Sequence, residues 1–217
     1  MIVNEVVTGL VALVIGYLLG SIPSAYIAAR LALGRDIRRL GGGNVGGLNT
    51  YREVGIWAAL AVAIVDFGKG VAAVSVAYWA LALTDLSQPW VPAAGLMAVV
   101  GHNWMVWLKF SGGKGMGAAI GSLVVLLPLY GYWPGLLIFS GVIIVPFIIT
   151  RNVALSMGIG LLSIPFLAWL GAQSGLFVAW SIVLGVIIGL KFLPTALAAW
   201  SRSHNKMEFI FDRGQRE

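Results

Sequence analysis

The sequence predicts an all-α integral membrane protein, a bundle of about seven transmembrane helices. Of its 217 residues 59% are hydrophobic and only 10% are charged, and its mean hydropathy is +0.94. Soluble domains are nearer 45–50% apolar and about 25% charged, so a lipid bilayer must be the solvent for most of this chain. The 29 Gly and nine Trp residues are typical of membrane helices, which pack through small residues and place Trp at membrane interfaces.

Seven apolar segments are each long enough to cross a membrane, which takes roughly 20 residues and at least about 17. The third and fourth segments could instead begin as a half-helix or a re-entrant segment beside residues 111–115. The first segment follows an acidic Glu5 and no early base, so it lacks the basic start of a signal peptide and is expected to be retained. The segments are residues 6–33, 55–83, 89–108, 116–132, 134–150, 153–170 and 176–192.

The basic residues predict the orientation, with the N-terminus outside and the C-terminus in the cytoplasm. Of the 14 Lys and Arg residues 13 then lie in or beside the inner connections or at the C-terminal end, only Lys69 is left over, inside the second span, and none falls in an outer loop, as the positive-inside rule requires. Residues 1–200 are expected to form one transmembrane domain, and residues 201–217 a polar, basic cytoplasmic tail. The inner basic residues, in or beside each connection, are Arg30, Arg35, Arg38, Arg39 and Arg52, then Lys109 and Lys114, then Arg151, and finally Lys191, Arg202, Lys206, Arg213 and Arg216.

Charge and composition also exclude several classes of partner. The net charge of +6 is distributed between apolar runs, which indicates a cytoplasmic membrane face and phosphorylated small molecules, and no nucleic acid. Cysteine is absent, which excludes disulfides and thiolate catalysis. The two His residues, His102 and His204, have no metal-ligand spacing around them, so neither a metal nor a cofactor is expected.

The first inner connection, residues 41–52, reads GGGNVGGLNTYR. Its glycines free the backbone to point several N–H groups at one anion. Asn44 and Asn49 add amide donors, and Arg52 adds a charged fork suited to phosphate. A flexible linker is the alternative, although linkers favour Ser. The glycines expected to bind substrate are Gly42, Gly43 and Gly46.

The second inner connection, residues 111–115, reads SGGKG and leads directly into an apolar helix. Gly112, Gly113 and the start of that helix would gather unpaired N–H groups, and Lys114 adds a positive charge. The spacing is not that of a Walker A loop. An ordinary interfacial turn is the alternative.

Three further groups of polar residues lie in or beside spans. Asp66 and Lys69 are three residues apart and share one helix face, so an ion pair is expected, either structural or catalytic. His102 precedes the second connection and could bind an anion, move a proton or cap its helix. Arg151 and Ser156 belong to the third inner connection. Together these connections predict a site for a phosphorylated, membrane-adjacent substrate.

The same residues resemble the bacterial acyl-phosphate–glycerol-3-phosphate acyltransferase family. That resemblance implies a seven-span, N-out protein of the bacterial cytoplasmic membrane, with its site on the cytoplasmic face. The matching residues are 20–24 (GSIPS), 36–38 (DIR), 43–46 (GNVG), Asn49, Arg52, 66–70 (DFGKG), 101–102 (GH), 109–110 (KF), 112–115 (GGKG) and 151–156 (RNVALS).

The resemblance implies transfer of an acyl chain from acyl phosphate to glycerol 3-phosphate, giving 1-acylglycerol 3-phosphate in phospholipid synthesis. His102, Lys114 and Asn44 would be catalytic. Lys114 and Arg52 would hold glycerol 3-phosphate, and Asn44 with the glycine backbone would hold acyl phosphate, while the Asp66–Lys69 pair would support them. Asn49, Gly42, Gly43, Gly46, Gly112, Gly113, Arg151 and Ser156 would complete the substrate-binding set.

The chain departs from the family pattern at several positions. Gly42, Leu48 and Ala154 stand where the family has hydroxyl residues, and Met105 stands where it has Pro. The family's H-R-x-N pattern after the last span is not evident in residues 191–195. A catalytically impaired relative, serving as a structural or lipid-binding subunit among other membrane subunits, is therefore the alternative. A small-anion transporter is a third possibility, but no inverted repeat is evident.

Overall fold

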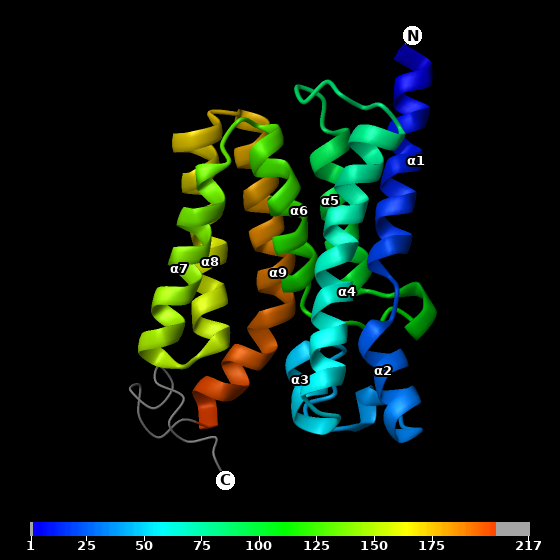
Figure 1. Cartoon of the computed structure of the whole chain (residues 1–217), viewed down its shortest axis with the longest axis vertical. Helices are drawn as coiled ribbons and strands as arrows, with labels where there is room; N and C mark the ends of the chain where they lie inside the picture. The colour runs from blue at the N-terminus through cyan, green and yellow to red at the C-terminus, as the bar shows by residue number, and fades with distance from the viewer. Residues whose placement is uncertain (1, 203–217) are drawn as a thin grey trace. The chain divides into compact units, whose positions relative to one another are not determined.

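The computed structural model describes residues 2–202, and every regular element among them is helical (Figure 1). The chain divides into two compact units, Met1–Leu126 and Leu127–Glu217. Unit one contains α1 (Ile2–Gly20), α2 (Ser24–Leu33), α3 (Gly47–Glu53), α4 (Ile56–Ser75) with a π-helical extension (Val76–Ala80), α5 (Trp90–Asn103), and two 3-10 turns (Ile37–Arg39 and Val106–Leu108). α6 (Met116–Leu129) runs from unit one into unit two, which contains α7 (Pro134–Thr150), α8 (Val153–Leu167) with a π-helical extension (Ala168–Ala172), and α9 (Gly175–Arg202).

The all-α prediction is confirmed for residues 2–202, and each predicted segment contains a helix. Four stretches are long and apolar enough to cross a membrane by length and composition: Asn4–Leu33, Ile56–Ala80, Leu155–Ala172 and Gly175–Pro194. α6 and α7 are apolar but shorter, and α5 has 14 residues. Seven crossings therefore stay a prediction. The expected tail lies outside the described residues from position 203 onward.

The first predicted segment is one apolar run in the sequence but two helices in the structure. α1 ends at Gly20, and α2 begins at Ser24, directly after Pro23. Proline has no N–H to donate and disfavours helical backbone in the residue before it. Ser24, the first residue after the break, has its side chain buried inside unit one.

α1 and α5 pack with their backbones in contact. A Cβ at Gly16 would meet the backbone carbonyl of Ala94, one at Gly20 would overlap the carbonyl of Ala98, and one at Gly101 would overlap the carbonyl of Tyr17. Small residues allow this approach in membrane helices, where close van der Waals packing replaces the hydrophobic effect. The contact places the end of α5 beside the break between α1 and α2.

α4 and α6 approach each other in the same way within unit one. A Cβ at Gly70 would overlap the carbonyl of Ala118, and one at Gly121 would overlap the carbonyl of Phe67. A Cβ at Gly117 would lie 2.9 Å from the Cβ of Asp66. The first turn of α6 therefore lies directly against the one charged turn of α4.

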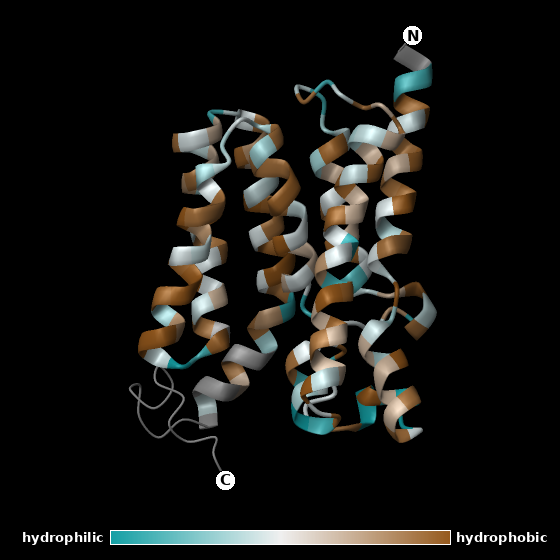
Figure 2. Cartoon of the chain, in the orientation of Figure 1, coloured by the Kyte–Doolittle hydropathy of each residue, from teal (hydrophilic) through white to brown (hydrophobic). Residues whose placement is uncertain are grey.

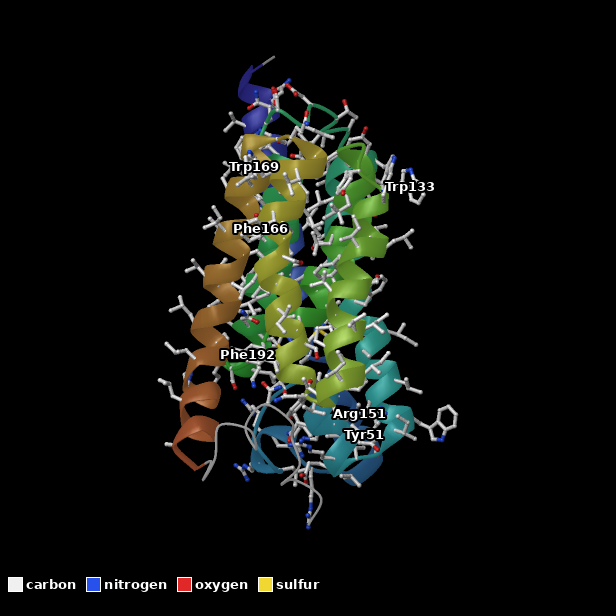
Figure 3. All side chains as sticks on the ribbon, turned by 90° about the vertical axis from the view of Figure 1, so that its left-hand side faces the viewer. Tyr51, Trp133, Arg151, Phe166, Trp169 and Phe192 are labelled. Atoms are coloured by element: carbon white, nitrogen blue, oxygen red, sulfur yellow. The ribbon has the colours of Figure 1, made fainter. Side chains whose placement is uncertain are left out.

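Unit two has aromatic residues at one end of its helices and a basic residue at the other. Trp133 and Trp169 are 63% and 66% exposed and project from one end, whereas Arg151 lies at the opposite end (Figure 3). Tryptophan favours membrane interfaces, and arginine favours the aqueous side. In unit one the end that carries the α2–α3 connection has hydrophilic residues (Figure 2), among them Arg35, Arg38 and Arg39.

Candidate functional site

A buried polar cluster in unit one is centred on a single carboxylate oxygen, Asp66 Oδ1. The Ser24 hydroxyl donates to it over 2.6 Å, and Lys69 Nζ donates to it over 2.6 Å. Lys69 Nζ also donates to Ser24 Oγ over 3.3 Å. All three side chains are buried, so the predicted ion pair exists and includes a hydroxyl from the α1–α2 break. Two buried charges are tolerated because each compensates the other.

His102, the penultimate residue of α5, joins this cluster to the second glycine loop. Its Nδ1 lies 3.5 Å from Asp66 Oδ1 but makes no hydrogen bond within the described part of the chain. Its Nε2 faces the opposite way, against Gly113, where a Cβ would collide with it. The imidazole is buried, so one edge faces the carboxylate and the other faces the loop.

The second glycine loop sits directly on the end of α5. Gly113 donates its N–H to the carbonyl of His102 over 3.0 Å. A Cβ at Gly112 would meet the carbonyls of His102 and Asn103, and one at Gly113 would lie 2.6 Å from the carbonyl of Val45. Residues from the first and second inner connections thus meet at His102, as a shared site requires.

The first glycine loop is held in shape by Asn49, the buried third residue of α3. Its Oδ1 accepts from the N–H of Gly42 over 3.2 Å, and its Nδ2 donates to the carbonyls of Leu40 and Asn44, each over 3.1 Å. These contacts give Asn49 a structural task in the loop. Its predicted role as a substrate ligand stays a prediction.

The other predicted residues of this region differ in exposure. Asn44 is half-buried, and its Nδ2 lies 3.0 Å from the Cβ position of Gly46. Arg52 is exposed at the end of α3. Lys114 is half-buried just before α6, and burial lowers its pKa below the ordinary 10.5. Of these three residues Lys114 stands directly before the first turn of α6, where a positive charge and the helix N-terminus would stabilise an anion.

Asp36 and Arg38 connect the two inner loops, a role that the sequence analysis did not assign. Asp36 caps the 3-10 turn by accepting from the N–H of Arg38 over 3.0 Å, and its carboxylate pairs with the guanidinium at 2.6 Å. The guanidinium also donates to the carbonyl of Leu108 over 3.1 Å. The side-chain hydrogen bond from Arg38 lowers the pKa of Asp36 from 3.8 to about 2. The D-x-R spacing was the available signal.

Ser24 is a second residue without an assigned role in the sequence analysis. It follows Pro23, which marks a helix start, but nothing local to residues 20–24 indicates a partner 42 positions away. The sequence provides the hydroxyl and the break, and the partner comes only from the packing of α2 against α4.

The third inner connection lies in unit two and forms the turn between α7 and α8. Arg151 is exposed and adopts a left-handed conformation with φ 57°. Asn152 caps α8 by accepting from the N–H of Leu155 over 3.0 Å, and the Ser156 hydroxyl donates to the carbonyl of Asn152 over 2.8 Å. These polar groups complete a helix cap, and their predicted contact with substrate stays a prediction.

The departures from the family pattern have different surroundings. Gly42 has open space where a Cβ would stand, and Leu48 is 48% exposed, so neither position is filled by a substitute group. Met105 is fully buried in a cluster with Ile37 and Leu108. The side chain of Ala154 lies outside the described part. No group of three or more His, Asp or Glu that could hold a metal occurs within residues 2–202.

Comparison with known proteins agrees with this geometry. The family model of glycerol-3-phosphate acyltransferase matches residues 10–206. Glycerol-3-phosphate acyltransferase 1 of Dehalococcoides mccartyi is 48% identical over 205 residues, covering 94% of this chain and 97% of the relative. A glycerol-3-phosphate acyltransferase of Prochlorococcus marinus is 39% identical over 207 residues, covering 95% and 94%.

A solved structure has the same fold. The crystal structure of PlsY (YgiH), an integral membrane glycerol 3-phosphate acyltransferase, in its glycerol 3-phosphate form, superimposes with a TM-score of 0.79 and 27% identity, covering 94% of this chain and 98% of the other. The match extends over nearly the whole of both chains. The chain therefore belongs to the glycerol-3-phosphate acyltransferase family of integral membrane enzymes.

Proposed function

We propose that this enzyme transfers an acyl chain from acyl phosphate to glycerol 3-phosphate at the cytoplasmic face of a bacterial membrane. A glycerol hydroxyl oxygen bonds to the acyl carbon, and the bond between that carbon and the phosphate oxygen breaks. The hydroxyl proton leaves with the departing inorganic phosphate or passes to solvent. The products are 1-acylglycerol 3-phosphate and inorganic phosphate.

One observation carries the proposal: the two glycine loops meet at His102, above the buried Asp66–Lys69 pair. Val45 of the first loop and Gly113 of the second lie within contact distance of one another. Lys114 adds a cation at the start of α6, where unpaired backbone N–H groups and the helix dipole also favour negative charge. Both proposed substrates carry a phosphate, so a site rich in donors suits each of them.

Acyl phosphate is an acyl donor that needs little chemical activation by the protein. It is a mixed anhydride and is already activated, so no acyl-enzyme is required, and the chain contains no cysteine to form a thioester. Holding two anions in contact and offsetting their charge can supply much of the rate. We assign acceptor binding to Lys114 and Arg52, and donor binding to Asn44 and the glycine backbone.

The orientation belongs to the same proposal. Seven crossings with the N-terminus outside would put every inner connection, and hence the phosphate site, at the cytoplasmic face. Loop 84–89 and the α2–α3 connection lie at opposite ends of unit one (Figure 1). The basic residues Arg35, Arg38 and Arg39 belong to the second of these, which is the cytoplasmic end under the positive-inside rule.

A non-catalytic subunit is not favoured as the alternative. A relative called an acyltransferase shares 48% of its residues with this chain over nearly its full length. The two positions that lack the family's hydroxyl groups, Gly42 and Leu48, are open or exposed, so water or substrate oxygens have room to occupy them. The basic and glycine framework is intact.

Purified enzyme tests the proposal directly. Acyl phosphate with glycerol 3-phosphate should yield inorganic phosphate and 1-acylglycerol 3-phosphate in equal amounts, whereas an acyl thioester should yield neither. Lys114→Ala should raise the KM for glycerol 3-phosphate by roughly ten- to a hundredfold, the effect of losing a hydrogen bond to a charged group.

The control is Arg35→Ala, which removes an exposed cation from the first inner connection and should leave the KM unchanged. Turnover with an acyl thioester in place of acyl phosphate would refute the donor assignment. An unchanged KM in Lys114→Ala would remove Lys114 from the site.

A further inference from the structure

Asn103, the last residue of α5, carries a buried side-chain amide that makes no hydrogen bond within residues 2–202. The residue is 0% exposed, and neither its Nδ2 nor its Oδ1 has a partner. Buried polar groups in folded proteins are nearly always paired. An amide with both ends unpaired lowers stability, so a fold that retains one does so for another reason.

The amide lies directly beneath the second glycine loop. Its Oδ1 is 2.8 Å from the Cβ position of Gly115, the residue before α6. The backbone carbonyl of Asn103 lies 2.6 Å from the Cβ position of Gly112. α6 has 14 residues, and the N–H groups of its first turn have no partner within the helix, which favours an anion at its start.

The backbone at both ends of the second glycine loop is in the left-handed region. Lys109 and Phe110 adopt left-handed conformations with φ 55° and 59°, and Gly115 has φ 79°. Left-handed backbone in two consecutive non-glycine residues is strained and is concentrated at sites that move or bind ligands. The glycines at 112 and 113 present no side chain between the loop and α5, so the loop backbone lies directly against the end of that helix.

We propose that Asn103 is a substrate-binding residue, whose Nδ2 donates to a phosphate oxygen of the substrate held at the start of α6. The shared chemistry is a phosphate monoester or acyl phosphate dianion, which both substrates of the proposed reaction carry. The inference rests on the proposed function for the identity of the ligand. It adds a donor from α5 to a proposed site otherwise built from the glycine backbone, Asn44, Arg52 and Lys114.

The first experiment separates function from structure with Asn103→Leu, which keeps the side-chain volume and removes both unpaired atoms. The melting temperature should stay the same or rise, because no hydrogen bond is lost. The kcat/KM for one substrate should fall by roughly ten- to a hundredfold, since a donor to a charged group is lost. Varying each substrate at saturating levels of the other identifies which phosphate Asn103 binds.

Ser122→Ala is the matched control, because Ser122 is equally buried and its hydroxyl already donates to the carbonyl of Ala118 over 2.9 Å. It should lower the melting temperature slightly and leave kcat/KM unchanged. If Asn103→Leu instead has wild-type kinetics, the proposal is wrong, whether its melting temperature rises or falls.

Ligand binding without turnover gives a second measurement. Glycerol 3-phosphate, and separately acyl phosphate, should raise the melting temperature of the wild type in proportion to the logarithm of ligand concentration above Kd. Asn103→Leu should lose most of that shift for one of the two. Equal shifts in both proteins would overturn the proposal. Binding with no turnover in the wild type would overturn the proposed function alone.

Discussion

At the scale of single residues, Asp66 is the group on which the others depend. It and Lys69 are the two charged residues of α4, and its Oδ1 accepts from both Lys69 and Ser24. His102 Nδ1 lies 3.5 Å from the same oxygen. One negative charge therefore offsets a buried ammonium and borders the imidazole that contacts the glycine loop.

Replacing Asp66 with Asn tests how much this charge matters. The amide oxygen can still accept hydrogen bonds, but Lys69 is left as an uncompensated buried cation, which costs about 3–5 kcal/mol. We expect a large loss of folded yield and a lower melting temperature. Asp85→Asn, in an exposed loop, is the control and should change neither.

The double variant Asp66→Asn/Lys69→Met should recover much of the stability, because it removes both charges. Wild-type stability in the single variant would instead mean that water reaches the pair.

Deprotonation of Lys114 should lower kcat/KM at alkaline pH. Burial lowers its pKa below the ordinary 10.5, so its positive charge is lost at a lower pH than that of an exposed lysine. If Lys114 binds a phosphate, kcat/KM should fall on the alkaline side at a pH below 10.5. Lys114→Arg stays charged there, since the arginine pKa exceeds 12.

The measurement is the pH profile of kcat/KM for glycerol 3-phosphate in both proteins. Lys114→Arg should move the alkaline limb to higher pH, even if planar guanidinium geometry lowers the maximum. Coincident alkaline limbs would assign the fall to another group.

At the scale of helices, the site depends on backbones packed without side chains between them. α1 meets α5 through Gly16, Gly20 and Gly101, and α4 meets α6 through Gly70 and Gly121. The first contact positions His102 at the end of α5, and the second places the start of α6 against Asp66. The second inner loop lies where the end of α5 meets the start of α6, beside the middle of α4.

Gly20→Ala and Gly68→Ala form a matched pair for this contact. Each adds one methyl group to a helix, but a Cβ at Gly20 overlaps the carbonyl of Ala98, whereas a Cβ at Gly68 meets nothing within 4 Å. Overpacking costs about 1–3 kcal/mol, so Gly20→Ala should lower the melting temperature and kcat together. Gly68→Ala should be neutral or slightly stabilising, because alanine favours the helix over glycine by up to about 1 kcal/mol. Equal melting temperatures for the two variants would show that α1 and α5 can move apart without loss.

At the scale of the whole molecule, the basic residues are distributed unevenly between the two ends of each unit. In unit two, Trp133 and Trp169 stand at the end opposite Arg151 (Figure 3). In unit one, loop 84–89 carries Asp85 and no base, while the opposite end carries the Arg residues of the α2–α3 connection. Each unit thus has one end without basic residues and one with them.

Reporter fusions test the orientation that this asymmetry predicts. A reporter inserted at Ser87 should report an external location, and one fused after Arg213 should report a cytoplasmic location. The positive-inside rule is the physical reason, because basic connections are retained on the cytoplasmic side. A periplasmic signal from the fusion after Arg213 would overturn the seven-span topology.

The sequence by itself determined the class of the molecule and the chemistry of its loops. Long apolar runs require helices, because a bilayer leaves no partner for backbone groups outside a helix or a closed barrel. Glycine, Asn and basic residues in the two inner connections indicated a phosphate site, and their spacing led to the family. These are local properties, since composition, hydropathy and motif spacing need no knowledge of which helices touch.

Only the tertiary structure decided which side chains meet. Ser24 and Asp66 are 42 residues apart in sequence, and the sequence of neither helix indicates that the two side chains are in contact. Asn49 reads as a ligand in the sequence, yet its amide holds the first loop together. Asn103 is the last residue of α5, and only the structure shows that its amide is buried and makes no hydrogen bond within the described chain. The physical reason is that contacts between helices depend on how closely their backbones approach and on which faces they turn to each other. Both are set by long-range packing and not by periodicity along one helix.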